Sequence, residues 1–273
     1  MASRNRRRGK KSHAGSYVLA ILLTLVSLFI LGGIGYLYLT ASSAGDFDKE
    51  TLCPTNGPTA ITAFLIDTTD PLSETTLLDL RTNFQRTASS IPVGSLLEIY
   101  SLTEVPGDLK KLFGRCNPGD ASTVSEWTAN PRIRQKRWQE LFKNILDKVA
   151  DDLPKGQGGE ASPIMAGIQK IKLGVFDQYS ELDVQKQIYV ASDMIEHTPL
   201  YSQYKSGIDY KTYKASNASR KYATSLSGID VGIWYIDRKD RKFNGIEHNS
   251  FWGNWVVDNG GNFIPSIRLE GMN

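Results

Sequence analysis

The sequence contains few of the residues that carry most metal and nucleophile chemistry. Its 273 residues include two cysteines and three histidines. The cysteines form no CxxC pair, and no Cys/His cluster has the spacing of a structural zinc site. The sequence also lacks a P-loop and the Gly-x-Ser-x-Gly turn of serine hydrolases. These absences argue against a zinc domain, a P-loop nucleotidase and an α/β-hydrolase.

Acidic residues are missing from the first 45 positions. The first acidic residue is Asp46, and six of the 32 Lys and Arg residues precede it. The rest of the chain therefore has 26 basic and 29 acidic residues. A nucleic-acid-binding fold carries its positive charge on the folded surface. A basic tail on a slightly acidic domain does not fit that class, and we expect no nucleic-acid partner. The basic tail residues are Arg4, Arg6, Arg7, Arg8, Lys10 and Lys11.

Charge of either sign is absent from residues 17–39, a run of 23 residues. About 20 apolar residues are enough to cross a bilayer as a helix. The sequence therefore predicts a cytoplasmic tail at 1–16 and one transmembrane helix at 17–39 in the inner (plasma) membrane. The C-terminal domain is then periplasmic or extracellular, because basic flanks stay in the cytoplasm. A cleaved signal peptide is the alternative, although its apolar region is usually only about 7–15 residues long.

Both cysteines, Cys53 and Cys116, lie beyond this apolar run. A domain outside the cytoplasm can keep a disulfide, so the two are a candidate pair, the alternative being two unrelated thiols. Residues 40–58 are small, polar and contain Pro and Gly, which predicts a linker. Residues 59–273 are then expected to form one domain.

Strand and helix patterns alternate through that domain. The first strand is expected at 61–66, followed by a helix that starts at Asp70-Pro71. This alternation predicts an α/β fold with a doubly wound, mainly parallel central sheet and helices on both faces. Polar sites in such sheets gather at the carboxyl ends of the strands. Further strands are expected at 95–103, 110–119, 186–193, 229–237 and 262–269, and helices at 132–153, 164–175 and 247–261.

Polar residues follow two of these strands. Asp67-Thr68-Thr69-Asp70 follows the first, Ser192-Asp193 ends the strand at 186–193, and Ser162 lies in a glycine-rich loop. Carboxylate and hydroxyl oxygens suit Mg²⁺. Three of these residues also fit a purely structural role. Asp70 fits a helix cap, Ser162 before Pro163 fits another, and Asp193 fits a cap of its turn.

The arrangement resembles the von Willebrand factor A-type (vWA) domain over about residues 59–270. That family has an Asp-x-Ser-x-Ser cluster after its first strand, a loop Thr or Ser, and an Asp after its fourth strand, which together form a metal-ion-dependent adhesion site. By resemblance, Asp67 is the leading aspartate, Thr69 the first hydroxyl, Ser162 the loop hydroxyl and Asp193 the second aspartate. The second hydroxyl of the cluster falls at Pro71. Asp70 and Ser73 are the candidate substitutes as additional ligands.

The resemblance implies a binding protein and not an enzyme. Mg²⁺ or another divalent cation would be its cofactor, and an acidic side chain of a protein partner in the cell envelope would complete the coordination. The tyrosine-rich segment 197–227 is a candidate contact surface or an ordinary surface helix. Two alternatives stay open: a metal-free vWA-like scaffold of an envelope complex, and an envelope hydrolase that uses Asp67 or Asp193 with His197.

Overall fold

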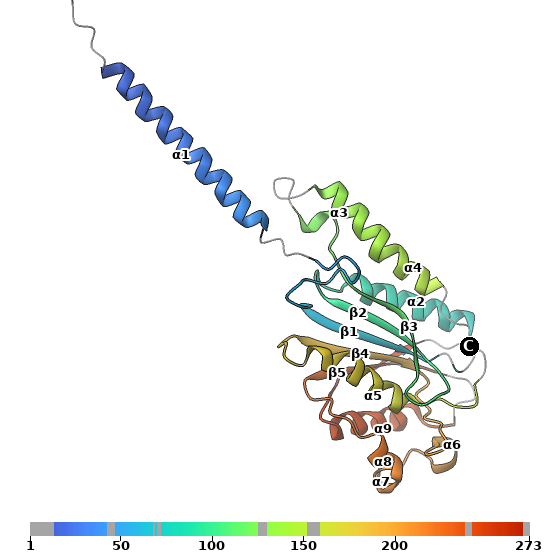
Figure 1. Ribbon diagram of the computed structural model, residues 1–273. Coiled ribbons are helices and arrows are strands. Elements are labelled where there is room, and N and C mark those ends of the chain that lie inside the picture. Colours follow the sequence, from blue (N-terminus) through green and yellow to red (C-terminus); the bar gives the residue numbers. More distant parts are fainter. Residues whose placement is uncertain are drawn as a thin grey trace, which may run out of the picture.

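The chain forms one long N-terminal helix followed by an α/β domain (Figure 1). The computed structural model describes residues 14–42, 47–67, 69, 72–124, 130–151, 159–237 and 242–269. Helix α1 spans Ala14–Ser42, and its segment Tyr17–Tyr36 is long and apolar enough to cross a membrane. Its described side chains pack on nothing in the domain and are exposed. The predicted apolar helix is therefore present, and it extends three residues beyond 17–39 at each end.

The domain is built on a seven-stranded sheet in the order β3-β2-β1-β4-β5-β6, with β7 also paired to β5. Every pair is parallel except β2 with β3, which is antiparallel. The doubly wound, mainly parallel sheet is thus confirmed. Its strands are β1 Ala60–Ile66, β2 Leu96–Leu102, β3 Leu109–Cys116, β4 Gln185–Ser192, β5 Ile229–Ile236, β6 Asn262–Phe263 and β7 Ile267–Leu269.

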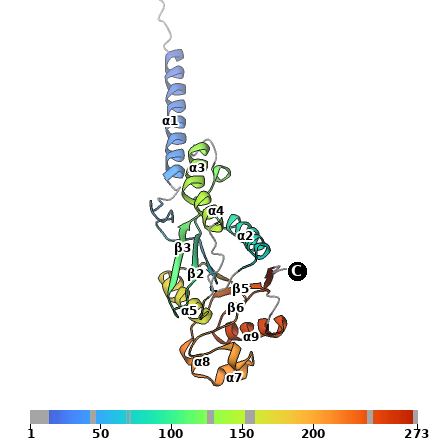
Figure 2. The same ribbon diagram turned by 90° about the vertical axis from the view of Figure 1, so that its right-hand side faces the viewer.

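Helices cover both faces of this sheet (Figures 1 and 2). Alternate side chains of a strand point to opposite faces, so Ala63 and Leu65 of β1 join one apolar cluster while Phe64 and Ile66 join the other. Helices α5 (Ile164–Gly174), α7 (Tyr210–Ala215), α8 (Asn217–Lys221) and α9 (Gly245–Asp258) cover the first face. Helices α2 (Glu74–Ser89) and α4 (Asn144–Asp151) cover the second. Two further short α-helices are α3 (Pro131–Trp138) and α6 (Gln203–Ser206).

Three element boundaries differ from those expected. Helix α2 begins at Glu74 with Ser73 as its N-cap, not at Asp70-Pro71, which lie outside the described residues. The helix expected at 132–153 runs as α3 and α4 joined by one π-helical turn at Gln139–Lys143. The strand expected at 262–269 is divided into β6 and β7 around Pro265, because proline has no N–H for the ladder.

The packed chain begins earlier than the linker expected at 40–58 implies. Leu52 is fully buried, and the Cys116 N–H donates to the Thr51 carbonyl at 2.8 Å. Cys53 and Cys116 form the predicted disulfide, with Cα atoms 4.7 Å apart. Residues from Phe47 onward therefore belong to the domain at the edge where β1 starts.

The tyrosine-rich segment 197–227 is only partly a surface. Tyr201 and Tyr213 are 4% and 2% exposed and belong to the core, whereas Tyr204 is 44% exposed. Of the two alternatives for this segment, the structure fits short helices with partly buried tyrosines, because Tyr201 and Tyr213 fill the space between the short helices and α9.

Candidate metal centre

Asp67 lies where β1 ends, and its loop holds one carboxylate oxygen. Oδ1 accepts hydrogen bonds from the Thr69 N–H at 3.0 Å and the Thr69 hydroxyl at 2.6 Å. Asp120 and Ser122 make the same pair of bonds, at 3.0 and 2.6 Å, on an exposed turn. This local pattern is an ordinary Asx turn and by itself indicates no metal site.

The other carboxylate oxygen of Asp67 accepts hydrogen bonds from hydroxyl groups in distant parts of the chain. Oδ2 accepts from Ser162 Oγ at 2.9 Å and from Ser192 Oγ at 2.7 Å, residues that are 95 and 125 positions away in sequence. Asp67, Thr69 and Ser162 are each 7–8% exposed, and Ser192 is fully buried. Three segments therefore converge on one buried carboxylate, which the Asp120 turn does not do.

Ser162 is positioned by the chain that follows β4. Its N–H donates to the His197 carbonyl at 2.8 Å, and the His197 N–H donates back to the Ser162 carbonyl at 3.0 Å. The alternative of Ser162 as the N-cap of α5 is wrong. Pro163 occupies the cap position without a side-chain bond, and Glu196 Oε2 accepts from the Met165 N–H at 2.9 Å instead.

Ser192 reaches Asp67 because of strand register. Leu65 pairs with Val190 and Ile66 with Ala191, so the next step along the two parallel strands sets Asp67 beside Ser192. Leu65 and Val190 also face the same apolar cluster. Two residues further along each strand, the side chains of Asp67 and Ser192 point to that same face. The sequence pattern places Ser192 only beside Asp193, yet the folded chain brings it into direct contact with Asp67.

Asp193 follows β4 and is 6% exposed. Its Oδ1 accepts from the Ile195 N–H at 3.1 Å, which fits the alternative that it caps its own turn. The turn contains Met194 at φ 63°, a left-handed conformation that is uncommon for a residue with a side chain. Two hydrogen bonds stabilise this turn. Ser192 Oγ accepts from the Met194 N–H at 2.8 Å, and the Trp252 indole N–H of α9 donates to the Met194 carbonyl at 2.8 Å.

Of the two candidate additional ligands, Asp70 lies outside the described residues. Ser73 is committed to capping α2: its Oγ accepts from the Thr76 N–H at 3.1 Å and lies 2.8 Å from the Thr76 hydroxyl. The structure thus gathers Asp67, Thr69 and Ser162 with Ser192, places Asp193 on the turn next to Ser192, and gives Ser73 a different role.

The donor set fits a hard divalent cation by its chemistry. In the part of the chain that the structure describes, no group of three or more His, Cys, Asp or Glu side chains is placed to hold a metal ion. A site at Asp67 therefore depends on hydroxyl oxygens. A hydroxyl that donates its hydrogen to a carboxylate keeps oxygen lone pairs for a cation. Oxygen ligands of this kind are those that Mg²⁺ accepts.

A buried polar network lies beside the centre and had no signal in the sequence. Glu196 is fully buried, and burial raises the pKa of its carboxyl to about 8. Its N–H donates to Gln203 Oε1 at 2.9 Å, and that oxygen lies 3.1 Å from His248 Nε2. Burial lowers the pKa of His248 to about 4, so this imidazole is neutral and structural. His197 Nδ1 lies 2.8 Å from Ser202 Oγ on the same turn.

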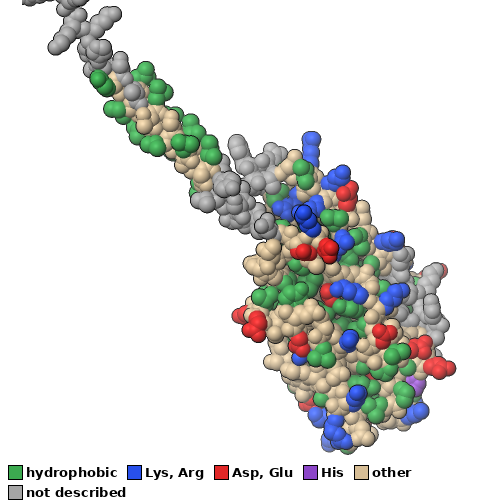
Figure 3. All heavy atoms as spheres, in the orientation of Figure 1, with side chains coloured by type: hydrophobic (Ala, Val, Ile, Leu, Met, Phe, Trp, Pro, Cys, Tyr) green, Lys and Arg blue, Asp and Glu red, His purple; other side chains and the backbone are tan. Residues whose placement is uncertain are grey.

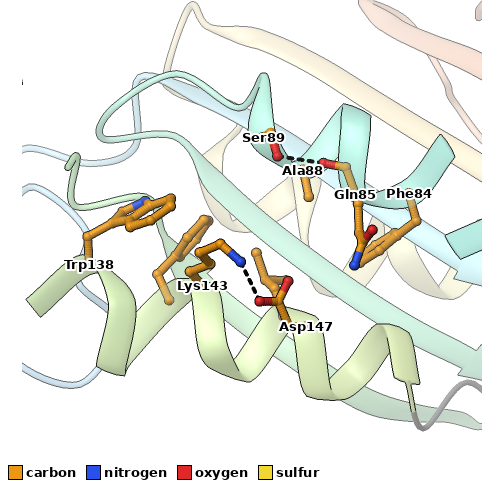
Figure 4. Close-up of a pocket in the computed structure, with 9 residues that line it drawn as sticks. Phe84, Gln85, Ala88, Ser89, Trp138, Lys143 and Asp147 are labelled. Atoms are coloured by element: carbon orange, nitrogen blue, oxygen red, sulfur yellow. Dashed lines mark hydrogen bonds and ion pairs between the residues drawn. The ribbon is translucent and has the colours of Figure 1, made fainter. Parts of the chain in front are cut away.

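Two hollows lie on the described surface. One, of about 210 Å³, lies between α2 and the α3–α4 helix (Figure 4). Phe84 and Trp138 line it, and the Lys143–Asp147 ion pair lies on its α3–α4 side. The other, of about 360 Å³, lies beyond the end of β5 between Asn244 and Arg268. The second shares the carboxyl edge of the sheet with Asp67, whereas the first lies on the face that α2 covers.

No protein-family model and no curated protein matches the sequence. Several solved structures are similar at low identity. BatB from Bacteroides thetaiotaomicron is 14% identical, with 78% of this chain and 92% of that one covered and a TM-score of 0.37. A von Willebrand factor type A protein from Catenulispora acidiphila is 12% identical (77% and 39% covered, TM-score 0.41). Manganese-loaded Plasmodium vivax TRAP protein is 11% identical (71% and 62% covered, TM-score 0.39).

The assignment of the fold rests on the domain's own sheet. Its central strands are parallel, and helices cover both faces. Asp67 follows the first strand, β1, and Asp193 follows the fourth strand, β4, which are the positions that the resemblance gives to the two aspartates. The domain therefore has the mainly parallel, doubly wound fold that the resemblance to the von Willebrand factor A-type domain implies.

Proposed function

We propose that the protein is a membrane-anchored interaction module that binds a divalent cation at the carboxyl edge of its sheet. Asp67, Thr69, Ser162 and Asp193 would hold the ion or its waters, joined by Ser192. The observation that carries this proposal is the convergence of the Ser162 and Ser192 hydroxyls on Asp67 Oδ2, at 2.9 and 2.7 Å. The function would be binding and not catalysis.

The electrostatics of the centre support a cation. The four described hydrogen bonds of Asp67 all come from neutral donors, namely one N–H and three hydroxyls. Neutral donors do not cancel the charge of a buried carboxylate, and Asp193 brings a second carboxylate to the same edge. A divalent cation would balance both charges. Mg²⁺ keeps several waters, so a partner carboxylate could replace one of them.

The surface around the centre offers a place for that partner. Leu200 and Tyr204 are 45% and 44% exposed. They follow His197, whose backbone forms two hydrogen bonds with the backbone of Ser162. The Tyr204 ring meets His197 edge to face at 5.4 Å between centroids. We propose that a protein with an exposed Asp or Glu docks here, with Leu200 and Tyr204 contacting its apolar surroundings.

The proposed cellular location of the domain is based on helix α1. We propose that this helix crosses the inner (plasma) membrane with the basic tail in the cytoplasm, which places the domain in the periplasm or outside the cell. The Cys53–Cys116 disulfide supports this side of the membrane, since disulfides persist in oxidising compartments. The partner would then be a protein of the cell envelope.

A metal-free scaffold is the second candidate, because four hydrogen bonds already satisfy the Asp67 carboxylate without an ion. The two candidates are separated by titrating the full chain in detergent with Mg²⁺ and with Mn²⁺ while recording heat and thermal stability. A cation that binds only the folded state stabilises it by about 2.7 kcal/mol at a hundredfold excess over its Kd. We expect this stabilisation in the native chain.

Variants identify the site of binding. Asp67→Asn and Ser162→Ala should abolish the effect of the cation, whereas Asp120→Asn, which alters a matching turn elsewhere, should leave it unchanged. No heat and no stabilisation at millimolar Mg²⁺ or Mn²⁺ would establish the metal-free scaffold. Binding that survives Asp67→Asn and Ser162→Ala would place the ion elsewhere.

A further inference from the structure

Helix α3 carries an unusual concentration of positive charge. Four of its eight residues are Arg or Lys and none is acidic. Arg132 and Lys136 are exposed, Arg137 is partly exposed, and Ile133 is an apolar side chain left 66% exposed among them. Residues three and four positions apart share a helix face, so Ile133, Lys136 and Arg137 point the same way. A helix face that carries several cations matches an anionic lipid surface, which attracts Lys and Arg side chains.

The fold places α3 at the edge where the chain enters the domain. The Arg134 guanidinium lies 5.9 Å from the Phe47 ring centroid and donates to the Pro118 carbonyl at 2.9 Å. Phe47 is five residue steps beyond Ser42, the last residue of α1. Five steps of extended chain reach at most about 18 Å. Both ribbon views show α3 at the end of the domain nearest α1 (Figures 1 and 2).

Among the residues that the structure describes, the acidic side chains near α3 leave most of its charge available. Glu140 lies 3.9 Å from Lys136 in an exposed pair, and such pairs contribute little. Asp48 is occupied by its own turn, where Oδ1 accepts from the N–H groups of Glu50 and Thr51. Lys and Arg side chains are visible over the end of the domain beside α1 (Figure 3).

We propose that α3 binds the anionic phospholipid headgroups of the membrane that α1 crosses. The inference rests on the proposed anchor and goes beyond it. Guanidinium groups match phosphate oxygens with paired hydrogen bonds, and each Lys or Arg at an anionic membrane surface adds about fivefold to the affinity. Contact is required, because screening removes the attraction beyond about 8–10 Å at physiological salt. Arg132, Lys136 and Arg137 meet phosphates, and Ile133 enters the interface between headgroups and acyl chains.

This contact fixes which end of the domain is presented to partners. The seven residues of β1 run from the entry edge to Asp67, an advance of about 23 Å. With α3 on the membrane, the carboxyl edge with Asp67 and Tyr204 faces away from the lipid. A partner then reaches the candidate metal centre without competing with the bilayer.

The test uses the full chain in lipid nanodiscs, either purely phosphatidylcholine or with a third of the lipid replaced by phosphatidylglycerol. Amide hydrogen exchange is measured over residues 131–138. We expect exchange there to slow by roughly tenfold or more in the anionic discs, and high salt to remove the difference. The triple variant Arg132→Gln, Lys136→Gln, Arg137→Gln should show no difference between the two lipids.

A matched variant controls for total charge. Lys205→Gln, Lys211→Gln, Lys221→Gln removes three exposed cations from α6, α7 and α8, at the end of the domain away from α1 (Figure 1). It should keep the full lipid dependence. The proposal is overturned if amide exchange of α3 in the native chain is the same in both lipids. It is also overturned if the two triple variants lose the lipid dependence of this exchange to the same extent. Failure of the anchor itself is seen separately, because a chain that alkaline carbonate extracts from membranes has no membrane-spanning helix.

Discussion

The two oxygens of the Asp67 carboxylate have different surroundings, and the difference decides what the residue does. Oδ1 belongs to a local turn that recurs at Asp120, while Oδ2 joins three segments of the domain. Local sequence could predict the first, since Asp-x-Thr favours an Asx turn. The second needs the strand register between β1 and β4, which only the folded sheet supplies.

Ser192 should matter more for stability than Ser162. The Ser192 hydroxyl donates to Asp67 Oδ2 and also accepts from the buried Met194 N–H. Ser192→Ala therefore leaves the Met194 N–H without this partner and removes one of the two hydroxyls that donate to Oδ2. We expect a loss of about 2–4 kcal/mol in the free energy of unfolding, against about 1–2 kcal/mol for Ser162→Ala, whose hydroxyl makes one described bond. Urea unfolding without divalent cations measures both. Equal losses would show that the Met194 turn does not depend on Ser192.

Glu196 should make stability depend on pH. Its folded-state pKa is about 8 against an ordinary value of 4.5, so between these pH values the folded state holds a proton that the unfolded state has lost. Stability from this group is therefore present below pH 4.5 and declines as pH rises toward 8, by up to about 1.4 kcal/mol per unit. Glu196→Gln keeps a neutral side chain of the same shape.

The variant should accordingly gain stability relative to the native chain as pH increases through that window. Urea unfolding in a metal chelator at several pH values measures the difference between the two chains. Parallel stability curves would show that Glu196 is not protonated in the fold. This residue could not be predicted from the sequence, because nothing in "SDMIEHT" distinguishes a buried acid from an exposed one.

Helix α5 packs closely on the sheet at Gly167. A Cβ at Gly167 would lie 2.8 Å from Leu102 Cδ1 and 2.9 Å from Leu65 Cδ2. Gly167→Ala should therefore cost about 1–3 kcal/mol by overpacking, despite the better helix propensity of alanine. Gly174→Ala in the same helix is the matched control, since its Cβ would meet nothing within 4 Å.

Thermal unfolding of the two variants separates packing from propensity. We expect Gly174→Ala to be neutral or slightly stabilising and Gly167→Ala to be destabilised. A stabilised Gly167→Ala would show that the leucine side chains move aside at little cost. Because Ser162 lies two residues before this helix and donates to Asp67, a shift of α5 would also change the surroundings of Asp67.

Element types were largely predictable, whereas their ends were not. The period of apolar residues predicted the strands near 61–66, 186–193 and 229–237 and the long helix after residue 131, because each buries one face or stripe. Asp70-Pro71 has the composition of a helix start, but the next cap in the chain, Ser73, is the one that is used. Several capping residues in a row satisfy the same local rule, and tertiary packing selects among them.

At the scale of the whole molecule, strand direction separates the two proposed binding regions. The entry segment, the disulfide and α3 share the edge where β1 begins, and the candidate metal centre lies at the edge where β1 ends. The mainly parallel direction of the strands could be anticipated from the alternating pattern, whereas their order could not. The position of α3 could not, because its apolar stripe is weak and its place depends on how β3 returns antiparallel to the entry edge.

The disulfide should be the main covalent support of that entry edge. It joins Cys53 and Cys116 across 63 residues, and closing a loop of this length is worth about 4 kcal/mol in the chain-entropy model. The double variant Cys53→Ala, Cys116→Ala should lose roughly that amount in urea unfolding. A reductant should lower the stability of the native chain toward that of the variant and leave the variant itself unchanged. If the reductant destabilises both chains equally, its effect does not come from this bond. If the variant is as stable as the native chain, residues 47–54 are held by the packing of Leu52 and by backbone hydrogen bonds such as that from Cys116 to Thr51. The disulfide would then not contribute to the proposed placement of α3.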